Sequence, residues 1–326
     1  MKKYQSLTSK ILLPIFAISL AVLAILAFSS CKNSDDKVRI GTAYGPTAVA
    51  TSALFENTTD YNFTTLTDPS ALIGKIDAGD IDIALVPSNF AATLYNKEHN
   101  VKMISINNLC SIKVVSQDTN IQSVKDIKNQ KIYSTGEKNV VGAILGILSK
   151  NENFSAKNAN VIYKTNVEEV LSNVSSDPKA LGVVTQPQAS LTARLNNNIY
   201  EILDVAEEWH SIYGANNNPV TAVAIVRNDF LEKHKDKVDK FLADEKNSIN
   251  HTNQNPAEAA YVINKLTTKT ENMYDATDIL NCKVEYIDGN EMQKLCNTFF
   301  KMIYDYDPSY IGNIVPDDNL YYIDAQ

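Results

Sequence analysis

The stretch LVPSNFAATLYN, residues 85–96, and the stretch LGVVTQPQASLTARLN, residues 181–196, share one order of residue types. Each runs from a short apolar, strand-like sequence into a proline and small polar residues, and then into a helical pattern. A strand that leads directly into a helix is typical of βαβ units, which build largely parallel sheets covered by helices. We therefore expect an equivalent strand-to-helix junction in each of two α/β lobes.

The rest of the body supports this division. Strand-like runs and helix-length segments alternate from residue 38 to residue 106, and a second series of the same kind runs from residue 112 to residue 204. The body exceeds the size at which a single hydrophobic core usually stops growing. We predict that residues 38–108 and 219–326 form lobe 1 and that residues 109–218 form lobe 2, each with a mostly parallel sheet flanked by helices.

The segment after residue 219 begins with one more strand-like run, TAVAIV, and is then mostly helical. Asp288 and Glu291 have the spacing of a capping box at a helix start. They precede an apolar stripe at helical spacing: Met292, Leu295, Cys296, Phe299, Met302 and Ile303. We expect this tail to pack on lobe 1, so that the chain crosses between the lobes twice, with the second crossing at residues 216–219.

The first 30 residues have the pattern of a signal peptide, with Lys2 and Lys3 before a long uncharged apolar run. Cys31 follows a small residue, as in a bacterial lipobox, so we predict lipid attachment at Cys31 and a lipidated tether over residues 31–37. An uncleaved membrane anchor is the alternative. Either way we expect an extracytoplasmic body, held at the cell membrane or at the outer membrane facing the periplasm.

The formal net charge is −8, and removal of a signal peptide with three lysines and no acid makes the mature chain more negative. Such a body repels a phosphate backbone, so a nucleic-acid partner is not expected. Cys110, Cys282 and Cys296 lack zinc-site spacing, and no metal site or cofactor is predicted. Cys282 and Cys296 either form a disulfide or remain buried thiols.

The site candidates are the residues at predicted strand ends, because ligands of open parallel sheets bind beyond the carboxyl ends of the strands. These residues are mostly hydroxyls, amides and glycines: Tyr44, Gly45, Pro46, Thr47, Ser88, Asn89, Asn107, Thr135, Gly136 and Gln186. Thr47, Ser88 and Asn89 have the alternative role of capping their own helices. Tyr44 and Trp209 are candidates for stacking on a flat ligand, or for ordinary packing.

Residue types and motifs that are missing narrow the function. None of the three arginines stands at a predicted helix start, so an Arg clamp for a carboxylate is not evident. The motifs GxSxG, HExxH, GxxxxGK and GxGxxG are absent, and the histidines are scattered. The sequence therefore favours binding over catalysis.

The order of GTAYGPTAVATSALFE, DAGDIDIALVPSNFAATLYNK, SVKDIKNQKIYSTG, GVVTQPQ and EEWHSIYG resembles the extracytoplasmic solute-binding lipoproteins of ABC importers. The group is the one that binds nitrate, sulfonate, bicarbonate or thiamine precursors. The resemblance implies a type II periplasmic-binding fold, and a monomer that closes on a small polar organic solute or an oxyanion. Such a receptor delivers its ligand to a membrane permease with a cytoplasmic ATPase.

The resemblance also indicates individual residues. Its first-strand loop matches residues 45–47, its VP-[ST]-N element matches Ser88 and Asn89, and its TG loop matches Thr135 and Gly136. The sequence EKNVV after the TG loop and the neutral Gln186 depart from the pattern, which indicates a different ligand. The alternatives are an enzyme of the thiamine pyrimidine synthase type and a signalling receptor, since both use this scaffold.

Overall fold

The computed structural model describes residues 37–98, 100–127, 129–151, 160–267 and 273–323. The predicted signal peptide, Cys31 and most of the predicted tether lie outside these ranges. Residues 38–326 form one unit, within which the strands divide into two sheets. No helix in the described ranges is long and apolar enough to cross a membrane.

The first sheet has the strand order β11-β4-β10-β3-β1-β2. Its strands are β1 (Val38–Ala43), β2 (Tyr61–Leu66), β3 (Ile83–Pro87), β4 (Val101–Asn108), β10 (Ala222–Arg227) and β11 (Val284–Ile287). β1 pairs in parallel with β2 and β3, whereas β10 pairs antiparallel with β3 and β4, and β11 antiparallel with β4. β1 to β4 therefore run in one direction, and β10 and β11 run against them.

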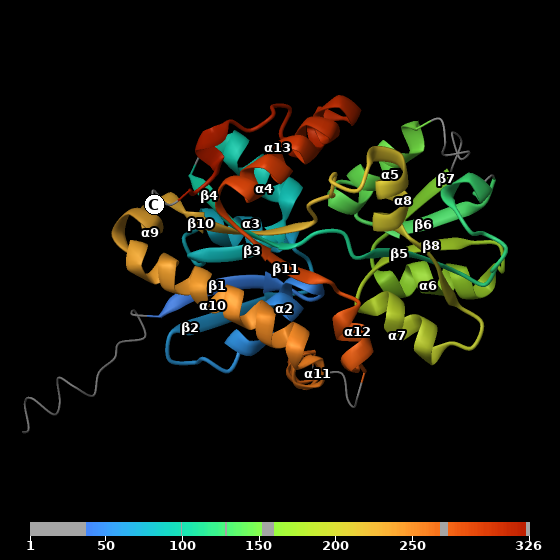
Figure 1. Ribbon diagram of the computed structural model, residues 1–326, viewed down its shortest axis with the longest axis horizontal. Helices are drawn as coiled ribbons and strands as arrows, with labels where there is room; N and C mark the ends of the chain where they lie inside the picture. The colour runs from blue at the N-terminus through green and yellow to red at the C-terminus, as the bar shows by residue number, and fades with distance from the viewer. Residues whose placement is uncertain (1–36, 99, 128, 152–159, 268–272, 324–326) are drawn as a thin grey trace, which may run out of the picture. The chain divides into compact units, whose positions relative to one another are not determined.

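The second sheet has the order β7-β6-β8-β5-β9 and repeats this plan. Its strands are β5 (Ile112–Ser116), β6 (Lys131–Thr135), β7 (Asn160–Lys164), β8 (Leu181–Thr185) and β9 (Tyr200–Asp204). β6 pairs in parallel with β7 and β8, and β5 lies antiparallel between β8 and β9. In each sheet, the strand that the chain enters on arriving from the other sheet, β10 or β5, runs against its neighbours (Figure 1). Most strands of each sheet therefore run in one direction, but both sheets are mixed, because the pairings of β5, β10 and β11 are antiparallel.

Helices cover both sheets (Figure 1). They are α2 (Pro46–Ala50), α3 (Ser70–Asp77), α4 (Ser88–Glu98), α5 (Val140–Lys150), α6 (Val167–Ser176), α7 (Gln188–Leu195), α8 (Val205–Tyr213), α9 (Asn228–Lys233), α10 (Lys235–Gln254), α11 (Pro256–Leu266), α12 (Ala276–Leu280) and α13 (Gly289–Tyr306). Short 3-10 helices are η2 (Ser52–Leu54), η3 (Val124–Asp126), η4 (Pro308–Ile311) and η5 (Asp318–Leu320). The sheets and their helical cover match the predicted fold class.

The apolar stripe of α13 packs as predicted, with Met292, Phe299 and Ile303 fully buried. The capping box expected before it does not form, because the Asp288 side chain makes no cap hydrogen bond. The Asp288 carboxylate instead accepts a hydrogen bond of 2.9 Å from the Tyr286 hydroxyl. A tyrosine from β11 thus takes the acceptor that the local sequence assigns to the helix start.

The three cysteines of the described residues are free and buried. Cys282 and Cys296 are therefore buried thiols and do not form a disulfide. Cys282 packs with α2 and α11, whereas the Cys296 Sγ lies 3.5 Å from the Met103 Sδ. Burial raises the pKa of both thiols, so they behave as small apolar side chains.

Candidate functional site

A cavity of about 230 Å³ lies where strand ends of both sheets meet, and we call it the strand-end cavity. Its polar lining consists of Tyr44, Thr47, Thr67, Asn108, Ser111, Thr135, Asn139, Thr185 and Thr221. Its apolar lining consists of Ala43, Pro46, Pro69, Leu85, Pro87, Ile112, Val140, Val141 and Ala222. The lining includes the carboxyl ends of β1, β3, β4, β6 and β8, which is where an open α/β sheet places a ligand.

Four of the predicted site residues line this cavity: Tyr44, Pro46, Thr47 and Thr135. The Tyr44 side chain is 39% exposed, and its hydroxyl donates to the Leu266 carbonyl at 3.2 Å. The Thr47 hydroxyl donates to the Ala43 carbonyl at 2.8 Å, so its hydrogen is used within the turn before α2. Thr135 makes no side-chain hydrogen bond within the described part of the chain.

Gly45 and Gly136 lie beside these residues in sequence and are not among the lining residues. Gly45 has a φ of 115° at the turn into α2. The Asn139 side-chain amide lies directly over the Cα of Gly136, in the space that a side chain there would fill. Both glycines therefore shape the loops that carry the lining.

Ser88 supports the chain crossing rather than the cavity. Its hydroxyl donates to the Val220 carbonyl at 2.5 Å, and its backbone N–H donates to the Thr221 carbonyl at 3.2 Å. Its side chain is fully buried. Ser88 thus fastens the start of α4 to the segment that returns to the first sheet.

Gln186 has the matching role at the other crossing. Its backbone N–H donates to the Ser111 carbonyl at 2.9 Å. Its side chain, also fully buried, donates to the Glu201 carboxylate at 2.9 Å and accepts from the Ser190 N–H at 3.0 Å. The two repeated stretches of the sequence therefore place equivalent residues against the two crossings.

Asn89 is buried beside the cavity region without lining it. Its side-chain N–H groups donate to the carbonyls of Lys138 and Tyr310, each at 3.1 Å. Because Lys138 follows β6 and Asn89 lies in the first turn of α4, this side chain joins a helix of the first sheet to a loop of the second. The Asn89 Oδ1 has no partner in the described residues.

Asn107 faces away from the cavity. Its side-chain amide donates to the Glu245 carboxylate at 3.4 Å, and the Ser105 hydroxyl donates to the same carboxylate at 2.5 Å. Burial raises the pKa of Glu245 to about 7, against smaller opposing effects of these two hydrogen bonds. Neighbouring residues on a strand point to opposite faces, so Asn108 faces the cavity instead.

Asn108 connects both crossings. Its Nδ2 donates to the Cys282 carbonyl at 2.7 Å. Its Oδ1 accepts from the Thr221 hydroxyl at 2.7 Å and from the Ser111 hydroxyl at 3.2 Å. Ser111 leads into the second sheet and Thr221 leads back into the first. One buried amide therefore joins the two chain connections between the sheets.

The site prediction missed six polar lining residues: Thr67, Asn108, Ser111, Asn139, Thr185 and Thr221. Thr67 and Thr185 follow or end a strand, so the strand-end rule that selected Thr135 applies to them as well. Asn139 is the N-cap of α5, where its Oδ1 accepts from the N–H groups of Val141 and Gly142. The sequence signal that could have identified Asn139 is an asparagine at a predicted helix start, in the loop that follows a predicted strand.

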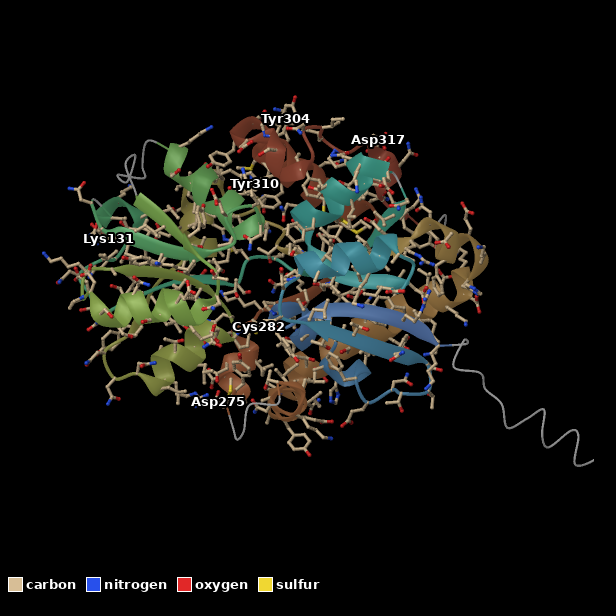
Figure 2. All side chains as sticks on the ribbon, turned by 180° about the vertical axis from the view of Figure 1, so that it is seen from behind. Lys131, Asp275, Cys282, Tyr304, Tyr310 and Asp317 are labelled. Carbon is tan, nitrogen blue, oxygen red and sulfur yellow. The ribbon has the colours of Figure 1, made fainter. Side chains whose placement is uncertain are left out.

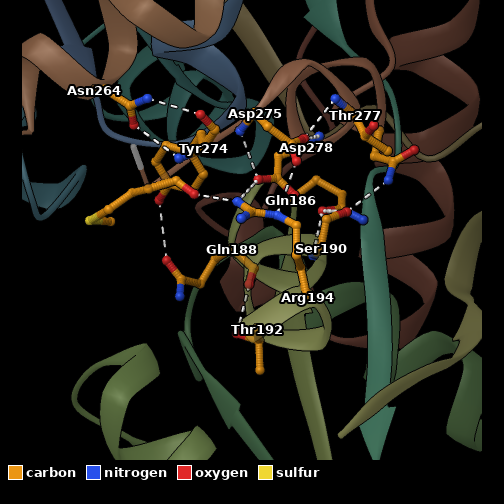
Figure 3. A network of polar contacts seen from close by, with 12 residues as sticks. Gln186, Gln188, Ser190, Thr192, Arg194, Asn264, Tyr274, Asp275, Thr277 and Asp278 are labelled. Atoms are coloured by element: carbon orange, nitrogen blue, oxygen red, sulfur yellow. Dashed lines mark hydrogen bonds and ion pairs between the residues drawn. The ribbon is translucent and has the colours of Figure 1, made fainter. Parts of the chain in front are cut away.

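On one side of the molecule, α7 of the second sheet is tied to α12 by charged groups (Figure 3). The Arg194 guanidinium lies 2.6 Å from the buried Asp278 carboxylate and 3.1 Å from that of Asp275. Asn281 donates to the Ser190 hydroxyl at 2.7 Å. The hydrogen bond with Asp278 raises the pKa of Arg194. We call this contact the α7–α12 link.

On another side, α5 of the second sheet packs against α13 and η4. The Tyr310 hydroxyl donates to the Glu137 carbonyl at 2.6 Å (Tyr310 is labelled in Figure 2). A Cβ on Gly142 would lie 3.1 Å from the Tyr310 hydroxyl, and one on Gly146 would overlap the Tyr306 ring. The two glycines, four residues apart on one helix face, thus admit two tyrosine rings. We call this contact the α5–α13 link.

Trp209 lies in the core and not at the cavity. Its side chain is fully buried, contacts the Phe299 ring edge to face, and donates to the Asn217 side chain at 3.1 Å. Of the two aromatic candidates for stacking, Tyr44 alone lines the cavity. In the described ranges, no group of three or more His, Cys, Asp or Glu residues is placed to hold a metal ion.

A family model described as menaquinone biosynthesis matches residues 42–305. The chain belongs to the menaquinone biosynthesis family. The match includes every lining residue of the cavity and all the strands except most of β1. No curated protein matches this member of the menaquinone biosynthesis family.

Solved structures share the fold of this family member. An ABC transporter protein from Parabacteroides distasonis is 15% identical with a TM-score of 0.72, over 88% of this chain and 99% of that chain. The periplasmic aliphatic sulphonate binding protein SsuA from Escherichia coli is 12% identical with a TM-score of 0.68, over 89% and 93%. The ligand binding component of an ABC-type import system from Staphylococcus aureus is 15% identical with a TM-score of 0.62, over 87% and 98%. The chain therefore has the type II periplasmic-binding-protein fold.

Proposed function

We propose that the chain is the solute-binding component of an ABC importer. It captures a small polar organic solute or an oxyanion in the strand-end cavity and delivers it to a membrane permease. The observation that carries this proposal is the meeting of strand ends from both sheets at one cavity. A ligand held there contacts both sheets at once, so it favours the arrangement in which they are close together.

The proposed ligand contacts come from Tyr44, Thr47 and Thr135, with Pro46 as an apolar wall. Gly45 and Gly136 shape the loops, and Ser88, Asn89, Asn107 and Gln186 hold the frame. This division follows from position, because the proposed contact residues line the cavity and the framework residues do not. The side chains of the framework residues donate to groups elsewhere in the protein.

The proposal includes the organisation that an importer component needs. Residues 1–30 are removed as a signal peptide, Cys31 carries the lipid, and residues 31–37 tether a monomeric body outside the cytoplasm. Residues 38–108 and 219–326 move as one lobe and residues 109–218 as the other. The two crossings between the sheets, with Asn108 between them, are the support for a hinge at these boundaries.

Identification of the bound molecule tests the binding function. The purified full-length chain is unfolded, and any released small molecule is identified by mass spectrometry. We expect a stoichiometric small molecule that raises the melting temperature when it is added back to ligand-free protein. A folded, ligand-free chain that responds neither to released material nor to sulfonates, nitrate, bicarbonate, pyrimidines and vitamin precursors would contradict the proposal.

The second candidate is an enzyme of the menaquinone biosynthesis family. The family match over residues 42–305 favours it. The two functions differ in what happens to the bound molecule. To distinguish them, an excess of that molecule is incubated with a small amount of protein and then analysed by mass spectrometry. Recovery of the unchanged molecule supports a receptor. Conversion of many molecules per protein molecule supports an enzyme.

A further inference from the structure

The side chains of the strand-end cavity have a common property: every lining residue of the described chain is uncharged. We propose that the cavity selects an uncharged small molecule of single-ring size that offers hydrogen-bond acceptors, and that it discriminates against the corresponding anion. This inference rests on the proposed binding function and narrows its ligand class.

The cost of burying an ion supports the selection. An ionised carboxylate or sulfonate that leaves water needs an opposite charge or several hydrogen-bond donors to compensate. The lining offers hydroxyls, amides and apolar groups, and no Arg, Lys or His among the described residues. A neutral ligand has far less hydration to lose, so the same cavity favours it over its anion.

The first-turn backbone amides of α5, a kind of donor that often binds anions, are already used at this cavity. The Asn139 Oδ1 accepts from the Val141 N–H at 2.9 Å and from the Gly142 N–H at 3.3 Å. These are amides of the first turn of α5, the part of a helix that attracts negative charge. An anion at this position would have to displace the cap of its own helix.

The remaining donors fit a neutral acceptor. Thr67, Thr135, Asn139 and Thr185 line the cavity. Within the described ranges, neither their three hydroxyls nor the Asn139 Nδ2 donates a hydrogen bond. A hydroxyl donates one hydrogen bond and an amide nitrogen donates two. A ligand with carbonyl or ring-nitrogen acceptors satisfies these groups, whereas an apolar ligand would leave them unpaired.

The size of the cavity limits the ligand further. An engineered protein cavity of about 150 Å³ accommodates benzene. The strand-end cavity, at about 230 Å³, has room for one substituted ring and lies below the usual volume of pockets that bind drug-sized molecules. Tyr44 and the three lining prolines, Pro46, Pro69 and Pro87, supply flat apolar surfaces for such a ring.

The test compares ligands of nearly equal shape that differ in charge. Benzamide is compared with benzoate, and benzenesulfonamide with benzenesulfonate, by calorimetric titration into ligand-free full-length chain at neutral pH. We expect the neutral member of at least one pair to bind about tenfold more tightly or better, which is a difference of about 1.4 kcal/mol. Equal or tighter binding of the anions overturns the selection while the binding function stands.

A result in which no member of either pair binds also overturns the inference. The binding function is then judged separately by the co-purified molecule. If a co-purified molecule is anionic at neutral pH, binding is retained and the charge selection is wrong. If no molecule co-purifies and none of the wider panel binds, both proposals fail.

Two variants test the donors. Asn139→Asp keeps an acceptor for the cap of α5 but replaces the Nδ2 donors with negative charge, and Thr185→Val removes a hydroxyl at nearly constant shape. We expect each variant to bind the neutral ligand several-fold more weakly than the parent chain. Thr65→Val is the matched control, because Thr65 lies on β2 and does not line the cavity. Unchanged affinity in both cavity variants would contradict the assigned donors.

Discussion

The two links between the sheets use different chemistry. The α5–α13 link places the rings of Tyr306 and Tyr310 against a glycine face, with the Lys150 Nζ 4.5 Å from the centre of the Tyr306 ring. The α7–α12 link places Arg194 against two carboxylates. Close-packed rings separate only at the cost of exposed apolar area, whereas ion pairs are weakened by salt and acid. We therefore expect the α5–α13 link to behave as the lasting contact and the α7–α12 link as the releasable one.

The largest effect is expected from Tyr310→Ala. The Tyr310 side chain is 6% exposed, and truncation of a buried aromatic ring typically costs about 3–5 kcal/mol. Tyr310→Phe keeps the ring and removes only the hydrogen bond to Glu137, for a loss of about 1 kcal/mol. Denaturant unfolding measures both. Equal losses in the two variants would mean that the hydroxyl, and not the packed ring, holds this link.

A smaller loss is expected from Arg194→Met. It leaves the Asp278 carboxylate, 1% exposed, without its cation, but the Arg194 side chain is itself 36% exposed and screened by solvent. We expect a loss of about 1–2 kcal/mol in the free energy of unfolding at low salt. At molar salt the difference from the parent chain should shrink.

The control for Arg194→Met is Lys301→Met, which removes an exposed ion pair with Asp305 on α13. That change should cost no more than about 0.5 kcal/mol. Tyr310→Ala should show no comparable salt dependence. A salt-independent loss in Arg194→Met would contradict the proposed difference between the links.

The glycine face is tested by Gly142→Ala. The added Cβ would lie 2.7 Å from the Glu137 carbonyl oxygen and 2.8 Å from that of Gly136, so the loop before α5 must shift. The strain exceeds the gain in helix propensity, and we expect a net loss of about 1 kcal/mol. Gly74→Ala on α3 is the matched control, because nothing lies within 4 Å of its added Cβ. That variant should be as stable as the parent chain or more stable, and thermal unfolding of both glycine variants measures the difference.

The smallest effect is a pH dependence of stability that comes from Asp204, at the end of β9. Its carboxylate lies 3.0 Å from the Lys283 Nζ, which follows α12, and 2.6 Å from the Lys113 Nζ. Burial by itself raises the pKa of Asp204, but the hydrogen bonds from the two lysines outweigh it and lower the pKa below its ordinary 3.8. The stability from this carboxylate is therefore present above pH 3.8 and is lost as the pH falls further. In Asp204→Asn, the free energy of unfolding should fall less steeply as the pH drops below 3.8 than it does in the parent chain. An equally steep fall in the variant would show that Asp204 is not the cause.

The fold was predictable because apolar periodicity reports strand and helix directly. The alternation over residues 38–106 and 112–204 gave two sheets, and TAVAIV was correctly assigned as a further strand, now β10. The capping box predicted at Asp288 is wrong, and the sequence alone could not show this, since the group that occupies the Asp288 carboxylate is the Tyr286 hydroxyl. The position of that hydroxyl depends on how β11 pairs with β4.

The strand-end rule identified Tyr44, Pro46, Thr47 and Thr135 at the cavity, because a strand's direction fixes which end faces a ligand. It could not choose between Asn107 and its neighbour, since that choice depends on which face of β4 is covered. Nor could it separate lining residues from those that fasten the crossings. The hydrogen bond from Ser88 to Val220 joins residues far apart in sequence, and no local pattern encodes it.

The most direct test of the account is the affinity of the co-purified molecule for the parent chain and for the double variant Thr135→Val/Thr185→Val. Both hydroxyls line the cavity and neither holds the framework, so the account predicts at least a tenfold loss of affinity, about 1.4 kcal/mol, at an unchanged melting temperature of the ligand-free protein. Full affinity in the double variant would place the ligand elsewhere and contradict the strand-end cavity as the binding site.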